Sequence, residues 1–187
     1  MADAFLAVDW GTTNRRVYRI EGGEVVRTER DEQGVTSVRD FAGSVADIRA
    51  RFGDLPMLLA GMVGANIGWR LAAYVAAPAG IADLAANLLR IDARTAIVPG
   101  VSTLAGGRPD VMRGEEVQLL GAIAAGLAPG DALLVQPGTH CKWATMRGGA
   151  IADPNGYTWW ISTRKEDFTP EEMKQRADDF FKQVDLK

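Results

Sequence analysis

The sequence contains very little cysteine and histidine. Among its 187 residues there is one cysteine, Cys141, and one histidine, His140. A single cysteine cannot form a disulfide within the chain, which fits a reducing compartment. A zinc site of several histidines and cysteines, or a Ser-His-Asp triad, lacks the supporting residue pattern.

Long apolar runs and a strong charge of one sign are also absent. No stretch approaches the roughly 18 uninterrupted apolar residues of a membrane-spanning helix. The N-terminal residues, with the acidic Asp3 and only a short apolar run, do not resemble a signal peptide. With 21 basic and 24 acidic residues the net charge is −3, which predicts no basic surface for nucleic acid or lipid. We therefore expect a cytoplasmic protein that binds neither nucleic acid nor membrane.

The remaining composition, 47% hydrophobic and 24% charged, is that of a globular protein. Extended segments bounded by turns are interleaved with segments of helical periodicity, which predicts an α/β fold with a mixed sheet. The first three strands form an antiparallel meander. Strands are expected at 4–8, 17–20, 24–29, 57–60, 95–98, 132–135 and 142–146, and helices at 41–51, 81–89 and 115–126.

The first loop whose residues could bind a ligand follows the first predicted strand. It contains Asp9, Gly11, Thr12, Thr13 and Asn14. Glycine allows a tight turn, so that backbone amides and the two threonine hydroxyls can donate hydrogen bonds to phosphate oxygens. The Asp9 carboxylate suits a magnesium ion held partly through water. A plain β-turn with polar residues is the alternative interpretation.

A second loop of this kind contains Gly138, Thr139, His140 and Lys142. It also lies between two predicted strands, so the two loops could face each other across a cleft and bind the phosphates of a nucleotide. Taken singly, His140 is better interpreted as a histidine satisfied within its loop, and Lys142 as a solvated charge. Cys141 is interpreted as a small packing residue, because no cation or helix N-terminus is evident to lower its pKa.

Between these loops, Arg113 and Gly114 precede Glu115 and Glu116 at the start of a predicted helix. One glutamate could accept the hydroxyl proton during phosphoryl transfer. The alternative is the ordinary preference for acidic residues at a helix N-terminus.

A glycine-rich stretch after the strand at 57–60 contains Gly64, Asn66 and Trp69. An amide and an aromatic ring could line the pocket of a small polar ligand. A glycine loop beside a packed tryptophan is the alternative.

Six segments, taken in order, resemble the 2-dehydro-3-deoxygalactonokinase family over residues 4–150. They are DWGTTNRR, GMVGANIGW, APAG at 77–80, IVPG at 97–100, DVMRGEEVQLLGA and QPGTHCKWA. The resemblance implies a ribonuclease-H-like domain of the actin-like ATPase superfamily. It also implies transfer of the ATP γ-phosphate, with Mg²⁺, to the 6-hydroxyl of 2-dehydro-3-deoxy-D-galactonate.

The same resemblance implies roles for individual residues. Asp9, Gly11, Thr12 and Thr13 form the first phosphate loop, and Gly138 and Thr139 belong to the second. The Arg113–Glu116 segment is similar in placement to the segment that supplies the base in related carbohydrate kinases. Glu115 is the first choice of base and Glu116 the second.

Residues 151–187 differ in character from residues 1–150, with four of the five lysines and the pair Trp159-Trp160. Part of this segment resembles the C-terminal end of glyoxalase/bleomycin-resistance-like proteins, which predicts one strand and a C-terminal helix that begins near Thr169-Pro170. We therefore expect the second kinase domain to be missing, and an uncovered sheet face to favour self-association. Three hypotheses remain: a kinase, a non-catalytic domain that binds the sugar acid or phosphate, and a glyoxalase-like or dioxygenase protein. The third hypothesis lacks support, because most of the chain offers no plausible His/Glu metal set.

Overall fold

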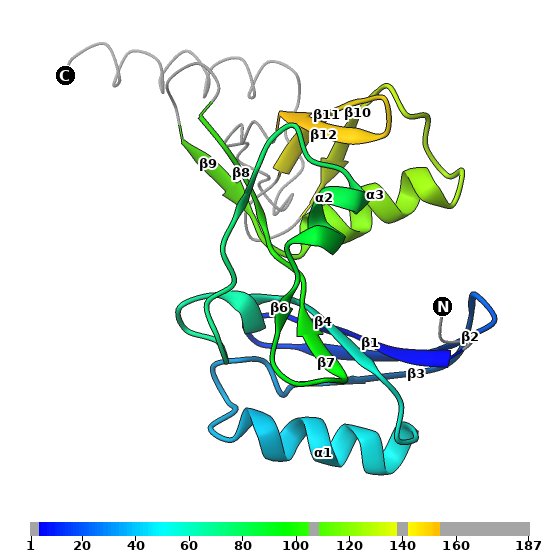
Figure 1. Cartoon of the computed structure of the whole chain (residues 1–187), viewed down its shortest axis with the longest axis vertical. Coiled ribbons are helices and arrows are strands. Elements are labelled where there is room, and N and C mark those ends of the chain that lie inside the picture. The colour runs from blue at the N-terminus through cyan, green and yellow to red at the C-terminus, as the bar shows by residue number, and fades with distance from the viewer. Residues whose placement is uncertain (1–3, 105–108, 138–141, 154–187) are drawn as a thin grey trace, which may run out of the picture.

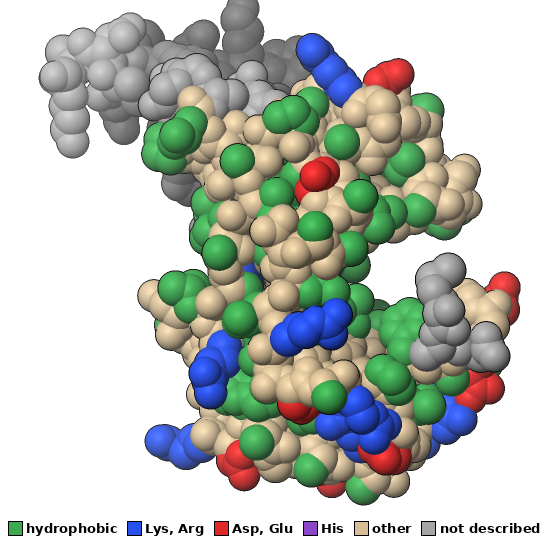
Figure 2. All heavy atoms as spheres, viewed as in Figure 1, with side chains coloured by type: hydrophobic (Ala, Val, Ile, Leu, Met, Phe, Trp, Pro, Cys, Tyr) green, Lys and Arg blue, Asp and Glu red, His purple; other side chains and the backbone are tan. Residues whose placement is uncertain are grey.

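The structure, a computed structural model, describes residues 4–104, 109–137 and 142–153. Within these residues two hydrophobic cores lie one above the other (Figure 1). The lower part consists of a large sheet and helix α1, and the upper part of helices α2 and α3 with two small sheets. Figure 2 shows a notch between the two parts.

The large sheet begins with the predicted antiparallel meander of β1 (Ala4–Trp10), β2 (Arg15–Glu21) and β3 (Glu24–Asp31). Gly22 and Gly23 connect β2 to β3 with φ angles of 56° and 89°. Glycine adopts this left-handed conformation without a steric penalty, which is why the pair suits a tight hairpin.

Three further strands extend this sheet on the other side of β1. β4 (Met57–Gly61) pairs with β1 in parallel, and β7 (Thr95–Ile97) pairs with β4 in parallel. β6 (Leu89–Arg90) pairs antiparallel with β7 and completes the order β3-β2-β1-β4-β7-β6. The predicted α/β class with a mixed sheet is confirmed.

Helix α1 (Phe41–Phe52) covers one face of the large sheet, as the spacing of its apolar residues predicts. Val45 and Ile48 of the helix pack in one core with Leu6 and Val8 of β1. Leu6 and Ile48 are completely buried, so this contact removes large apolar side chains from water and contributes to the stability of the fold.

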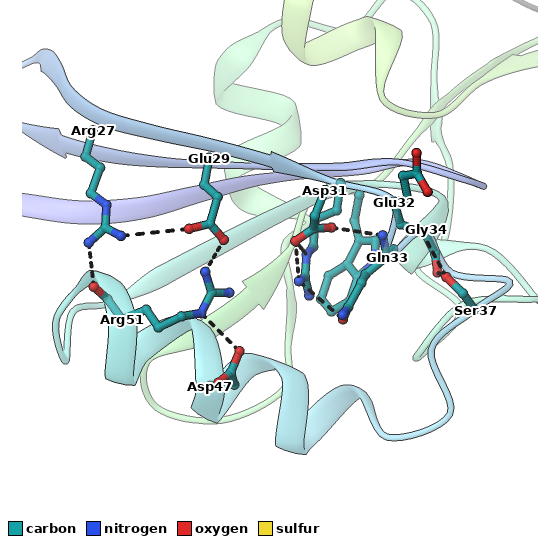
Figure 3. Close-up of polar contacts among 11 residues, drawn as sticks. Arg27, Glu29, Asp31, Glu32, Gln33, Gly34, Ser37, Asp47 and Arg51 are labelled. Atoms are coloured by element: carbon teal, nitrogen blue, oxygen red, sulfur yellow. Dashed lines mark hydrogen bonds and ion pairs between the residues drawn. The ribbon is translucent and has the colours of Figure 1, made fainter.

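Polar contacts also attach α1 to the outer strand β3 (Figure 3). Arg51 of the helix pairs with Glu29 of β3 and, at 3.1 Å, with Asp47 one turn earlier. Arg27 donates to the Arg51 carbonyl at 2.6 Å, and its guanidinium lies 4.1 Å from the centroid of the Phe52 ring. Because most of these groups are partly exposed, each contact adds only modestly to stability.

The upper part holds the second core, which lies between helices α2 and α3 and the three-stranded sheet β10-β11-β12. A further small sheet has the order β5-β8-β9. The elements not yet bounded are η1 (Met62–Gly64), β5 (Val75–Ala76), α2 (Ile81–Ala86), β8 (Val101–Thr103), β9 (Asp110–Met112), α3 (Glu115–Ala124), β10 (Ala132–Gln136), β11 (Lys142–Arg147) and β12 (Ala150–Asp153).

The helix predicted over 81–89 is wrong in its last three residues. Helix α2 ends at Ala86, where Asn87 leaves the helical conformation and its side chain donates to the Asp83 carbonyl at 2.8 Å. Leu89 and Arg90 instead pair with β7 as an edge strand. The spacing of the leucines is compatible with a helix or a strand, and pairing with β7 decides for the strand at Leu89.

Strand β12 runs across the boundary expected at residue 150. It pairs antiparallel with β11, and Ile151 is completely buried and exchanges two backbone hydrogen bonds with Ala79. Residues 151–153 therefore belong to the same packed unit as the residues before them. Among the helices of the described residues, none is long and apolar enough to cross a membrane.

Candidate functional site

A cleft of about 410 Å³ opens where several elements of the two parts end or begin. Its walls come from the first loop, from Gly61 at the end of β4, from the start of α3, and from Gln136 at the end of β10. A neighbouring hollow of about 680 Å³ shares Asp9, Arg16 and Gln118 with it and extends along β1. The first loop, the start of α3 and residues Gln136 and Pro137 thus lie together at this cleft.

The first loop is fixed through its backbone. The Gly11 amide donates to the Asn14 carbonyl at 2.9 Å, and the Asn14 side chain donates to the Thr13 hydroxyl at 3.0 Å. Thr36 donates to the Thr12 carbonyl from both its amide, at 3.2 Å, and its hydroxyl, at 2.9 Å. Thr12 and Thr13 are exposed at the cleft, so their hydroxyls are accessible to a ligand.

Buried neighbours hold the base of this loop. The Trp10 indole donates to the Gln33 carbonyl at 2.8 Å, and the Arg15 guanidinium lies 5.0 Å from the Trp10 ring centroid. Arg15 also pairs with Asp31 at 2.6 Å. Since Trp10 and Arg15 are almost completely buried, they position the loop rather than bind a ligand.

Asp9 and Arg16 form an ion pair of 2.9 Å at the cleft. Both side chains are partly exposed, at 28% and 40% respectively. A carboxylate suits a magnesium ion, and a guanidinium suits phosphate oxygens. The sequence alone does not point to a role for Arg16. The register of the β1–β2 pair places Arg16 directly opposite Asp9, and this pairing identifies it as a cleft residue.

Two glycines allow the backbones around the cleft to approach closely. Gly114 has a φ of 111°, and a Cβ atom there would lie 3.2 Å from the Cα of Gly61. Gly61 has a φ of 91°, and a Cβ atom there would lie 2.9 Å from the Trp10 carbonyl oxygen. The start of α3 therefore packs closely against the backbone at the end of β4, and the end of β4 against that of β1. Larger residues at these two positions would cause strain.

Glu115 and Glu116 occupy different environments although they are adjacent. The Glu115 carboxylate accepts from the Arg113 amide at 2.9 Å and lines the cleft. The Glu116 carboxylate accepts from the Gly114 amide at 2.7 Å but is completely buried. This burial raises the pKa of Glu116 to about 7. Both carboxylates therefore accept hydrogen bonds from backbone amides just before α3. Of the two, only Glu115 also lines the cleft.

Arg113 is largely buried in the lining of the cleft and joins the start of α3 to the segment after β4. Its guanidinium donates to the Ala72 carbonyl at 2.8 Å and lies 4.2 Å from the centroid of the Tyr74 ring. A Cβ atom on Gly64 would lie 2.9 Å from Nη1 of Arg113. Gly64 therefore makes room for this arginine, a relation that the sequence did not reveal.

Asn66 and Trp69, the other candidates of this segment, lie apart from the cleft lining. Asn66 is exposed. The Trp69 ring stacks on Phe41 at 6.2 Å with an interplanar angle of 10°, and Phe41 in turn contacts Trp10 at 5.4 Å. Trp69 thus belongs to an aromatic stack under the first loop.

The second loop enters the cleft through Gln136, whose side chain donates to Gln118 of α3 at 2.7 Å. The predicted ligands Gly138, Thr139 and His140 lie outside the described residues, as does Cys141. Lys142 pairs with Asp110 of β9, and its side chain is 13% exposed. It is therefore held between β9 and β11, away from the first loop.

Comparison with known proteins identifies the chain. The model of the 2-keto-3-deoxy-galactonokinase family matches residues 9–157. The chain belongs to this family. It is 36% identical over 157 residues to the 2-dehydro-3-deoxygalactonokinase of Escherichia coli (strain K12), covering 82% of this chain and 53% of that protein. It is also 39% identical over 155 residues to a Rhizobium meliloti (strain 1021) protein named as a probable 2-dehydro-3-deoxygalactonokinase, covering 78% and 50%.

A solved structure from Sinorhizobium meliloti, described under the same kinase name, has a similar fold. It is 36% identical, with a TM-score of 0.73, and the match covers 82% of this chain and 53% of that one. The chain thus spans about half the length of the curated relatives it matches.

Proposed function

We propose that this chain acts in the ATP-dependent phosphorylation of 2-dehydro-3-deoxy-D-galactonate at its 6-hydroxyl. Family membership supports the reaction class and the sugar-acid substrate. The observation that carries the proposal is the cleft in which Asp9, the two exposed threonines and Glu115 converge. Such a cleft combines the phosphate-binding groups and the carboxylate base that phosphoryl transfer requires.

The large sheet supports the finer assignment of a ribonuclease-H-like fold. Its first three strands form an antiparallel meander, and β4 and β7 continue the sheet in parallel beside β1. The first loop leaves the sheet at the end of β1, beside the ends of its parallel neighbours. We therefore assign this half of the actin-like ATPase architecture to the chain.

The residues around the first loop fit ATP and Mg²⁺. Bound magnesium would neutralise negative charge on the phosphates, and Asp9 is the carboxylate placed to hold it through water. The hydroxyls of Thr12 and Thr13 and the guanidinium of Arg16 would donate to phosphate oxygens. The ion pair of Asp9 with Arg16 keeps both groups at the cleft.

Glu115 is the proposed base, since it lines the cleft while Glu116 is buried. Its carboxylate would accept the proton of the sugar hydroxyl. Arg113 would then act as a positioning residue, because its guanidinium is occupied with Ala72 and Tyr74. Asn14 lies in the cleft and is the proposed contact to the sugar acid. The other residues predicted to contact a ligand do not line the cleft, namely Gly64, Asn66, Trp69 and Lys142.

A second candidate function is a non-catalytic domain that binds the sugar acid or phosphate. The groups that line the cleft support this alternative, because the exposed Thr12 and Thr13 hydroxyls and the Arg16 guanidinium could bind phosphate without turnover. Phosphoryl transfer, by contrast, often also requires closure of a second domain over the site.

A coupled kinase assay with ATP, Mg²⁺ and the sugar acid distinguishes the two. Asp9→Asn removes the charge at the cleft, and Asp47→Asn is the matched control, since Asp47 pairs with Arg51 on the far helix. We expect turnover in wild type and in the control, and a loss of at least about 100-fold in Asp9→Asn. Absence of turnover in folded wild type, with retained ligand binding, would support the non-catalytic domain instead.

A further inference from the structure

The ion pair at the cleft occupies the same carboxylate that is placed to hold magnesium. Nη1 of Arg16 donates to Oδ2 of Asp9 at 2.9 Å. Within the described residues no further donor contacts this carboxylate. A cation that approaches Asp9 must therefore compete with one neighbour, the guanidinium of Arg16.

Arg16 is also the accessible cation of the cleft lining. The charged side chains of this lining are Asp9, Arg16, Arg113 and Glu115. Arg113 is only 8% exposed and donates to the Ala72 carbonyl, which holds its guanidinium in place. Arg16 is 40% exposed, and among the described residues its hydrogen-bond partner is Asp9. Of the two arginines, Arg16 is thus the one that can change its partner.

The pair of Asp9 and Arg16 should separate easily when new partners arrive. Both side chains are partly exposed, and ion pairs of this kind are weak, because water screens the charges and the side chains lose freedom. Separation is unfavourable only if one member is left without a partner or beside a like charge. The outcome therefore depends on which charges the ligand carries.

Free metal, free phosphate and their complex differ in this respect. A free magnesium ion attracts Asp9 but repels Arg16, which is already in contact with that carboxylate. A free phosphate attracts Arg16 but repels Asp9. A magnesium–phosphate complex offers a cation to Asp9 and oxygens to Arg16 at the same time. Only the complex replaces the ion pair with two favourable contacts.

We propose that Arg16 makes the first loop selective for a metal–phosphate complex, because its guanidinium competes with free divalent cations for Asp9. When the complex binds, the pair exchanges partners, so that Asp9 holds the metal and Arg16 a phosphate. This inference rests on the proposed function, since it takes ATP with Mg²⁺ as the ligand. An arginine that only donated to phosphate would have no effect on the binding of free Mg²⁺.

Binding of free Mg²⁺ tests the competition without nucleotide or turnover. It is followed in proton–nitrogen spectra at constant ionic strength, through the amides of Trp10 and Gly11 beside Asp9. Arg16→Gln removes the competing charge, so we expect Mg²⁺ to bind about three- to fivefold more tightly than to wild type. Arg16→Lys keeps the charge and should stay close to the wild-type affinity.

Arg30→Gln is the matched control for the loss of one positive charge. Arg30 lies directly opposite Arg16 in the β2–β3 pair and is exposed, but it does not line the cleft. We expect this variant to bind free Mg²⁺ as wild type does. Free Mg²⁺ that binds Arg16→Gln no more tightly than Arg30→Gln would overturn the proposal.

Binding of ADP with Mg²⁺ tests the exchange of partners and should change in the opposite direction. Arg16→Gln loses a charged donor to phosphate, so we expect at least about tenfold weaker binding, with Arg30→Gln unchanged. An unchanged affinity in Arg16→Gln would also overturn the proposal. If folded wild type does not bind ADP with Mg²⁺, the proposed function fails, whereas the comparison with free Mg²⁺ still decides whether Arg16 competes with the metal.

Discussion

The two meanders of this chain share a local plan but differ in their surroundings. β1-β2-β3 is covered by α1 and extended by β4 along its inner edge. β10-β11-β12 packs one face into the upper core, and among the described residues its other face is open at β10. Turns and strand pairing thus follow from the local sequence, while burial is decided by the elements that come after.

This difference has a direct consequence for the site. The first loop rests on a meander held on one face by α1 and at its edge by β4, and its base residues Trp10 and Arg15 are almost completely buried. The second loop extends from β10, whose outer face carries exposed aliphatic residues. Among the described residues, the first loop therefore extends from the more deeply buried of the two meanders.

The largest expected effect comes from truncating corresponding leucines. Leu6→Ala removes a completely buried side chain and should lower the free energy of unfolding by about 3 kcal/mol. Leu133→Ala removes a side chain that is 59% exposed, so we expect a loss below about 1.5 kcal/mol. Urea denaturation of both variants measures the difference. Equal losses would show that the two meanders are buried alike.

A second prediction concerns the buried acid at the start of α3. The pKa of Glu116 in the folded protein, about 7, lies above its ordinary value of 4.5. The stability that this shift contributes is complete below pH 4.5 and is lost as the pH rises to about 7. Glu116→Gln cannot ionise and should remove this slope. Its free energy of unfolding relative to that of wild type should therefore increase by about 3 kcal/mol between pH 4.5 and pH 8.

Glu115→Gln is the matched control, because Glu115 also accepts from a backbone amide but lines the cleft. It removes only the smaller contribution that the Glu115 charge makes to the raised pKa of Glu116, so most of the pH dependence between 4.5 and 7 should remain. Denaturation at several pH values distinguishes the two variants. An unchanged slope in Glu116→Gln would show that this carboxyl ionises normally in the folded protein.

The smallest effect should come from the two Gly-Gly turns. Gly22 and Gly148 have the same φ of 56°, and a Cβ atom on either would meet no atom within 4 Å. Gly22→Ala and Gly148→Ala should therefore cost the same, about 1 kcal/mol each, from the backbone conformation alone. A much larger cost at one turn, measured by thermal denaturation, would mean that the two hairpins are not equivalent.

Much of the lower part could be predicted from the sequence. The alternation in β1 and the spacing from Phe41 to Phe52 are local patterns, and both elements form where expected. β5, β8 and β9 were missed because two- and three-residue strands have no periodicity of their own. Leu89 was assigned to a helix because only pairing with β7 makes it a strand.

The part of the cleft lining that comes from one sequence motif could be predicted. Asp9 and residues 11–14 line the cleft together because they lie at the end of β1 and in the loop that follows it. The partner of Lys142 and the place of Arg113 against Gly64 depend on contacts between segments distant in sequence. Such contacts leave no local pattern, and the parallel between the two meanders became evident only from their equal turn geometry.

The proposed function requires that the cleft at the first loop bind the phosphates of ATP. Proton–nitrogen correlation spectra of the 20.1 kDa chain, recorded with increasing Mg²⁺ and ADP, measure this binding residue by residue. We expect shifts concentrated at Gly11–Asn14 and at the start of α3, and their loss in Asp9→Asn but not in Asp47→Asn. Shifts confined to other residues, or no saturable shifts in the folded protein, would contradict it.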